Sequence, residues 1–282
     1  MKPAHSESGS ILLDAFMSLF LGSIVLGTAL VSFTSIWSRS NELRLKAELY
    51  SEARLILDML AFDIRMSGSG MPLGQSDFDS SSAEIGEAAL PVLPASHSGM
   101  VSFRINEFGA STTLTAPFSA AQGSRTLSVA STAGFSPGDT LYLSNMPVGG
   151  TAGLRGSIAS VGSTTITLDE NFIASPSALF AAGSTVEPVK QLVYEQSQNR
   201  ITRDDGDGPI VLAPQSSVHF TFLDLQGNAL TVPLTAEVIK SSLAAVRIQI
   251  ELQTAAAASS NNTPYSTVTS QTVALRNINL NR

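Results

Sequence analysis

The sequence predicts an α+β protein in which a long N-terminal helix packs on an antiparallel, β-rich head domain. The first observation is an uncharged apolar run over residues 15–37. The second is that residues 38–66 contain no Gly or Pro and repeat apolar residues every three or four positions, as an amphipathic helix does. The third is a series of short, alternating segments separated by turn residues over the rest of the chain, which is typical of antiparallel strands.

The run over residues 15–37 is long enough to be a transmembrane helix. It would span roughly 34 Å, against about 30 Å for the hydrocarbon core of a bilayer. The apolar region of a secretory signal peptide is shorter, about 7–15 residues, and ends at a cleavage site. Small and hydroxylated residues within the run would let helices approach closely: Ser18, Gly22, Ser23, Gly27, Thr28, Ser32, Thr34 and Ser35.

No turn separates the apolar run from the amphipathic segment, so we expect one helix over residues 10–66, roughly 80 Å long. Glu42 and Lys46 form a favourable i,i+4 pair in its second half, and Gly68, Gly70 and Pro72 end it. The apolar stripe that should pack on the head consists of Leu45, Leu49, Ala53, Ile56, Leu60 and Ile64.

A lone carboxylate, Asp14, stands at the start of the apolar run, and a short polar leader before it ends in Gly9. A charge in lipid costs on the order of a few kcal/mol. A counter-charge on a neighbouring chain would offset that cost. The pattern therefore indicates assembly rather than catalysis.

These N-terminal residues resemble type IV pilin-like proteins with a class III prepilin leader. The helix end at residues 51–68 is similar to that of minor pilins of the PilW type and pseudopilins of the PulJ type. The resemblance covers residues 9–72 well and residues 189–279 loosely. It implies that prepilin peptidase cuts between Gly9 and Ser10, that Ser10 is N-methylated, and that Asp14 is an assembly contact. The family usually has Phe and Glu where this chain has Ser10 and Asp14.

The resemblance implies a minor pilin or pseudopilin that initiates or caps a type IV pilus or a type II secretion-like filament. Its expected partners are other minor pilins or pseudopilins, the major pilin, prepilin peptidase, the inner-membrane assembly platform and membrane lipid. The expected location is the bacterial inner membrane with a periplasmic head, and afterwards the pilus or pseudopilus. Two alternatives stay open: a filament-tip adhesin, and a membrane-anchored periplasmic enzyme.

The chain divides into five expected parts. These are a leader (1–9), the long helix (10–66), a linker with the start of the head (67–112), a β-rich insertion (113–188) and a C-terminal sheet (189–282). A loop is expected over 75–98, and a hairpin over 190–202 with Val193 and Ile201 on its core side. The other expected strands are 100–105, 126–130, 140–143, 157–161, 164–168, 218–224, 243–252 and 268–280.

Composition argues against several classes of function. The net charge of −7 disfavours nucleic acid, whose binding needs a basic surface. The absence of cysteine excludes disulfides and thiolate metal sites. The 282 residues include only 14% charged residues, against about 25% in an average soluble domain.

No group of residues predicts an active site or a cofactor, so we expect a protein that is not an enzyme. The three histidines are scattered in the sequence, whereas zinc needs three or four clustered ligands. An acidic turn at residues 204–208 has the oxygen ligands that calcium favours but not the EF-hand spacing. Asp169 and Glu170 are adjacent and would point to opposite faces of a strand. The histidines and the turn carboxylates are His5, His97, His219, Asp204, Asp205 and Asp207.

Overall fold

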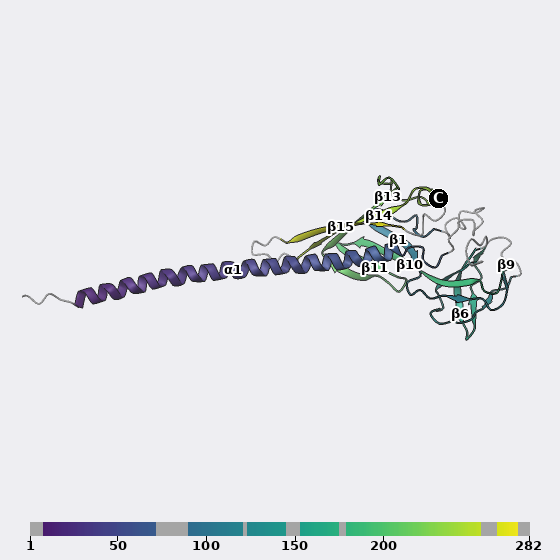
Figure 1. Ribbon diagram of the computed structural model, residues 1–282, viewed down its shortest axis with the longest axis horizontal. Coiled ribbons are helices and arrows are strands. Elements are labelled where there is room, and N and C mark those ends of the chain that lie inside the picture. Colours follow the sequence, from purple (N-terminus) through teal and green to yellow (C-terminus); the bar gives the residue numbers. More distant parts are fainter. Residues whose placement is uncertain are drawn as a thin grey trace, which may run out of the picture.

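The computed structural model describes residues 8–71, 90–120, 123–144, 153–174, 179–254 and 264–275. Its dominant element is the single helix α1 (Ser8–Arg65), 58 residues long, which runs far beyond the β-rich head (Figure 1). The expected helix over 10–66 is confirmed to within two residues at each end. The chain leaves the helix through Gly68 and Gly70, both with positive φ, a conformation that glycine adopts without steric cost.

Among the described residues all strand pairs are antiparallel, and most strands belong to one ten-stranded sheet. Together with α1 they confirm the α+β class. The strands of this sheet are β1 (Met100–Ile105), β2 (Thr112–Thr113), β4 (Thr126–Ser128), β5 (Thr140–Ser144), β6 (Gly153–Val161), β7 (Thr165–Leu168), β8 (Ile173–Ala174), β10 (Thr185–Ser197), β11 (Arg200–Asp204) and β12 (Ile210–Pro214).

The long strand β10 connects two regions of this sheet. Its first half pairs with β2 and β5, and its second half pairs with β1 and β11. The expected boundary between residues 188 and 189 therefore falls inside one continuous strand. The hairpin from β10 to β11 turns at Gln198 and Asn199, which both have positive φ, as a two-residue type I′ turn requires.

Two smaller sheets complete the head. One contains β13 (Ser216–Leu223), β14 (Ala245–Gln253) and β15 (Ser266–Ala274), in that order. The other pairs β3 (Phe118–Ser119) with β9 (Leu179–Phe180). A short helix, α3 (Ala236–Ser241), lies between β13 and β14, and the hydroxyl of Thr235 caps it by accepting from the Val238 amide.

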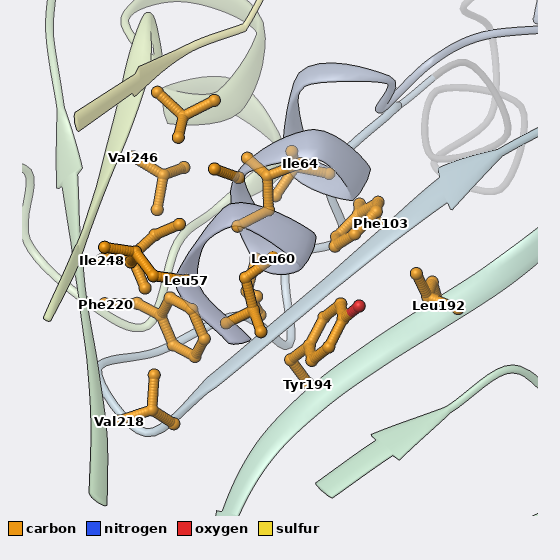
Figure 2. Close-up of a cluster of buried hydrophobic side chains, with 14 of the residues drawn as sticks. Leu57, Leu60, Ile64, Phe103, Leu192, Tyr194, Val218, Phe220, Val246 and Ile248 are labelled. Atoms are coloured by element: carbon orange, nitrogen blue, oxygen red, sulfur yellow. The ribbon is translucent and has the colours of Figure 1, made fainter. Parts of the chain in front are cut away.

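The main core lies where α1 meets the two larger sheets. Figure 2 shows Leu57, Leu60 and Ile64 of α1 between side chains of β1 and β10 on one side and of β13 and β14 on the other. The first sheet contributes Val101, Phe103, Leu192, Tyr194 and Ile201, and the second contributes Val218, Phe220, Phe222, Val246, Ile248 and Ile250. The predicted stripe is confirmed, with Ala53, Ile56, Leu60 and Ile64 buried and Leu45 and Leu49 half-buried.

A second group of buried apolar side chains lies apart from the first. Its members come from residues 114–186 and include Phe118, Leu127, Leu143, Ile166 and Phe180. The expected strands at 126–130, 140–143, 157–161 and 164–168 correspond to β4, β5, β6 and β7.

The expected orientation of one hairpin residue is wrong. Ile201 is buried as predicted, but Val193 is only half-buried, and its neighbours Leu192 and Tyr194 face the core instead. Side chains alternate along a strand, so an error of one residue exchanges the two faces.

The loop expected over 75–98 is only partly described, because residues 72–89 lie outside the described residues. Its end pairs with β1: Val92 forms a bridge with Phe103, and the amide of Leu93 donates to the carbonyl of Ser102. Both edges of β1 are therefore paired, and Ser102 and Arg104 on its second face are buried. The expected last strand is confirmed as far as Ala274, and residues 276–282 also lie outside the described part.

Two leucines on α1 test the packing of its second half. We expect Leu60→Ala, in the core, to lower the free energy of unfolding by about 2–5 kcal/mol, because it removes buried methyl groups and leaves a cavity. Leu55→Ala is the matched control, since Leu55 is exposed, and it should change stability by less than about 0.5 kcal/mol. Chemical denaturation of the full chain in detergent measures both. Equal losses in the two variants would contradict the packing.

Candidate functional site

The first half of α1 is apolar and exposed. Its large side chains from Leu12 to Trp37 lie in the open, and no part of the most apolar stretch is buried against the head. Among the described residues, α1 is the one helix long and apolar enough to cross a membrane, judged by length and composition. Such a continuous apolar surface is characteristic of a segment that meets lipid or other helices.

Three hydroxyl groups within this apolar half are satisfied by the helix itself. Thr28 donates to the carbonyl of Val25 at 2.9 Å, and Thr34 donates to that of Leu30 at 3.0 Å. Ser23 donates to the carbonyl of Phe20 at 2.7 Å. A hydroxyl without a partner is costly to bury, so these bonds allow the segment to enter an apolar environment.

Asp14 is an exposed residue within this half, and it forms no ion pair with another described residue of the chain. It is the only charged residue between residues 8 and 38. Gly9 and Ser10 lie in the first turn of α1, and their side chains are outside the described part. The structure places Ser10 one helical turn before Asp14, and the Asp14 carboxylate is exposed within the described part of the chain.

At its other end, α1 is attached to the head by a group of polar and charged residues, of which Asp63 and Tyr194 are buried and the others are half-buried. The Tyr194 hydroxyl donates to the Asp63 carboxylate at 2.5 Å. The Arg203 guanidinium lies 3.5 Å from the same Asp63 oxygen and also pairs with Glu107 at 2.6 Å and Asp205 at 3.1 Å. One cation from β11 thus joins α1 to two loops of the head.

The electrostatics of this site keep Tyr194 and Arg203 protonated. Burial raises the pKa of Tyr194, and the neighbouring Asp63 carboxylate raises it further, so the hydroxyl stays protonated and donates. Burial alone would lower the pKa of Arg203, but the hydrogen bond and the negative charge of Glu107 raise it. The guanidinium therefore stays charged.

Patterns in the sequence do not predict this group. Its members are far apart in the chain, and Asp63 gives the one local indication, because it is a carboxylate beside the buried face of an amphipathic helix. The partners Glu107, Tyr194 and Arg203 become neighbours only when the hairpin and the loop after β1 fold against α1.

The residues considered for metal binding have structural contacts. The Asp204 carboxylate accepts from the amides of Gly206 and Gly208, while the Asp205 carboxylate binds Arg203. His97 Nδ1 accepts from the Gly99 amide in a turn. The side chains concerned are already used in turns and ion pairs.

Other charged candidates are separated from one another. His219 is exposed on β13, Glu170 pairs with Arg125 at 3.0 Å, and His5 lies outside the described residues. Within the described ranges, no group of three or more His, Asp or Glu side chains is arranged to hold a metal ion.

A comparison with protein-family models, curated proteins and solved structures finds no match to this chain.

Tyr194 predicts a specific dependence of stability on pH. Above about pH 10 a tyrosine in the unfolded chain ionises, whereas Tyr194 in the folded protein keeps its proton because its pKa is raised. The contribution of Tyr194 to the free energy of unfolding is fully present below about pH 10. It is lost as the pH rises further, by about 1.4 kcal/mol per pH unit. Tyr194→Phe should remove this part of the slope in urea unfolding measured from pH 9 to 11.

Burial also raises the pKa of Tyr142, so the Tyr194→Phe variant should keep a smaller slope. Tyr50→Phe is the control, since Tyr50 is exposed on α1, and it should leave the slope as in the wild type. An unchanged slope in Tyr194→Phe would show that the hydroxyl does not hold its proton as described.

Proposed function

We propose that this protein is a structural subunit of the type IV pilin-like class, a minor pilin or pseudopilin that initiates or caps a filament. The observation that carries the proposal is the division of one unbroken helix into two halves. The first half is apolar and exposed, and the second half packs on the head. A subunit of this kind can be stored in a membrane and then transferred into a bundle of similar helices.

The first half of α1 suits both environments. Lipid covers its apolar side chains before assembly, and helices of neighbouring subunits cover them afterwards. Small residues such as Ser18, Gly22 and Gly27 allow close packing between helices, and a Cβ at either glycine would meet nothing within the chain. The Thr28 and Thr34 hydroxyls already have partners in the helix, so neither environment has to supply one.

Asp14 is proposed as the contact that sets the register between subunits. Cleavage after Gly9 would create a free, methylated amine at Ser10, and the amine of one subunit would pair with the Asp14 carboxylate of the next. In an apolar bundle such a pair specifies position more than it adds stability. Until the leader is removed no amine exists, so cleavage would control assembly.

The proposed subunit is anchored in the bacterial inner membrane with its head in the periplasm, and it joins a pilus or pseudopilus on assembly. Its partners are other minor pilins or pseudopilins, the major pilin, the assembly platform and prepilin peptidase. Residues 113–188 are proposed as an insertion in the pilin head. The separate group of buried side chains between Leu114 and Val186 supports this, and it makes a filament-tip adhesin the second candidate role for this region.

Processing of the N-terminus tests the class of protein directly. We expect the mature chain from its native cells to begin at methylated Ser10, and Gly9→Val to retain the leader from Met1, because the peptidase needs a residue without a side chain at the cut. Intact-mass spectrometry of the two purified proteins distinguishes these products. A wild-type chain that still begins at Met1 would favour the membrane-anchored enzyme instead.

Substitution of Asp14 tests the assembly contact. We expect Asp14→Ala to reduce incorporation into sheared filaments at least tenfold, because it leaves a buried amine without its partner, a loss of about 3–5 kcal/mol in comparable pairs. Asp14→Glu should largely restore incorporation. The control is Asp169→Ala, at an exposed carboxylate on the head. Wild-type incorporation of Asp14→Ala would refute the role of this residue.

A further inference from the structure

The strand β15 has one edge that points away from β14. In the ladder between the two strands, the amide of Leu275 donates to the carbonyl of Ala244, and the amide of Thr254 donates to the carbonyl of Tyr265. The register between these points is continuous. Main-chain groups alternate between the two sides of a strand, so the odd-numbered residues point at β14 and the even-numbered residues form a free edge. These residues are Ser266, Val268, Ser270, Thr272 and Ala274.

The main-chain groups on this free edge have no partner within the part of the chain that the structure describes. There, β15 is the last strand of its sheet, and none of its five even-numbered residues forms a main-chain hydrogen bond on the free edge. The edge extends over nine residues, or roughly 30 Å. A row of unpaired amides and carbonyls is a template for another strand. The edge therefore specifies a partner with an extended main chain.

The free edge of β15 lacks the features by which proteins usually keep a sheet edge unpaired, which are charges, prolines and bulges. Residues 264–275 contain no charge, and no proline follows Pro264 among them. The strand β12, at one end of the larger sheet, differs in each respect but charge. It has five residues, it lies between Pro209 and a terminal Pro214, and its pairing with β11 contains a register shift. The edge of β12 is thus closed, and the edge of β15 is open.

The direction of β15 restricts which chain can supply the partner strand. Figure 1 shows β15 alongside α1. The Lys46 Nζ lies 4.9 Å from the centroid of the Tyr265 ring, just before the strand, and Val273 near its end belongs to the core that Ile64 enters. The strand therefore runs away from the apolar half of α1, and an antiparallel partner runs toward the membrane.

A second copy of this chain does not provide such a partner. Two copies anchored in one membrane carry their β15 strands in the same direction, so their free edges cannot pair antiparallel. Parallel pairing is less stable per residue, and the other edge, at β12, is closed by Pro209 and Pro214. The open edge of β15 therefore fits a strand from a different subunit.

The side of α1 next to β15 fits an uncharged segment. Tyr50 lies one turn after Lys46 on the same side of the helix, and its side chain is exposed. The charge of Lys46 is already paired with Glu42 at 2.6 Å. An added strand with apolar or hydroxyl side chains on its inner face would contact Tyr50 without burying an unpaired charge, which would be costly.

We propose that the free edge of β15 binds an extended, uncharged segment of a different filament subunit, which adds to the sheet as an antiparallel strand running toward the membrane. This contact rests on the proposed function, because it places the partner in the same filament. The sheet of β13, β14 and β15 then continues into the neighbouring subunit. Its main-chain hydrogen bonds fix the two heads relative to each other, independently of the contact at Asp14.

Residue-resolved hydrogen exchange tests this contact and contains its own control. The amides of Thr269 and Gln271 point at β14, so they should be protected both in the purified full chain in detergent and in sheared filaments. The amides of Val268, Ser270 and Thr272 should exchange freely in the purified chain. In filaments we expect these three amides to exchange at least about tenfold more slowly, because a partner strand then accepts from them.

A proline on the free edge tests the same contact through assembly. Ser270→Pro removes an amide that points away from β14, a position at which an edge strand tolerates proline. We expect its incorporation into sheared filaments to fall about tenfold, because the ring blocks a partner strand. Thr126→Pro on β4 is the matched control and should incorporate as the wild type does. The Arg125 carbonyl accepts from the Leu168 amide of β7, so the Thr126 amide points away from β7.

The other outcomes each overturn the proposal. Fast exchange of Val268, Ser270 and Thr272 in filaments that contain the chain would refute this contact and leave the proposed function standing. Wild-type incorporation of Ser270→Pro would have the same meaning. Protection that appears in the purified chain alone as its concentration rises would assign the edge to a second copy. Absence of the wild-type chain from filaments would refute the proposed function, and the contact with it. Protected Thr269 and Gln271 amides in Ser270→Pro show that its sheet is folded.

Discussion

The packing of the second half of α1 between two sheets holds the rest of the structure in place. Leu60 and Ile64 contact side chains from β1 and β10 on one side and from β13 and β14 on the other. Without the helix each sheet would expose an apolar face to water, at about 25 cal/mol per Å². Because α1 is unbroken, the same contact also fixes the direction in which the apolar half leaves the head.

The buried carboxylate of Asp63 and its half-buried partner Arg203 add specificity to this packing. An apolar stripe alone would tolerate small rotations and shifts of α1, whereas Asp63 must meet both Tyr194 and Arg203. Buried ion pairs of this kind contribute little net stability relative to apolar residues of similar size. Their effect here is to select one position of the helix. Arg203 also pairs with Glu107 and Asp205, so the loops that carry these two residues are fixed relative to the helix.

The two halves of α1 share one secondary structure and differ in what covers them. In the second half, apolar residues recur every three or four positions, so one face of the helix packs on the head and the opposite face is exposed. In the first half, apolar residues surround the helix, and the described head contacts none of them. The chain therefore keeps an apolar surface that the described head leaves uncovered, as is characteristic of a segment that meets lipid or other helices.

Local patterns in the sequence determined a large part of this fold. The period of the apolar residues predicted α1 and its buried stripe, because a single helix imposes its own repeat on the chain. Alternation and turn residues likewise predicted β1, β5, β13 and β14. The unusual position of Asp14 was also evident from the sequence, since a charge next to an apolar run needs no tertiary information to be noticed.

Only the tertiary structure decided the contacts between distant segments. It showed that β10 is one strand shared by two parts of the sheet, that Leu192 and Tyr194 rather than Val193 face the core, and that Asp63 meets Arg203. It also showed that Phe62 stays exposed while Leu60 is buried. Each of these features depends on contacts between segments that are far apart in the sequence. Local periodicity describes the faces of an element but does not specify the neighbour that covers each face.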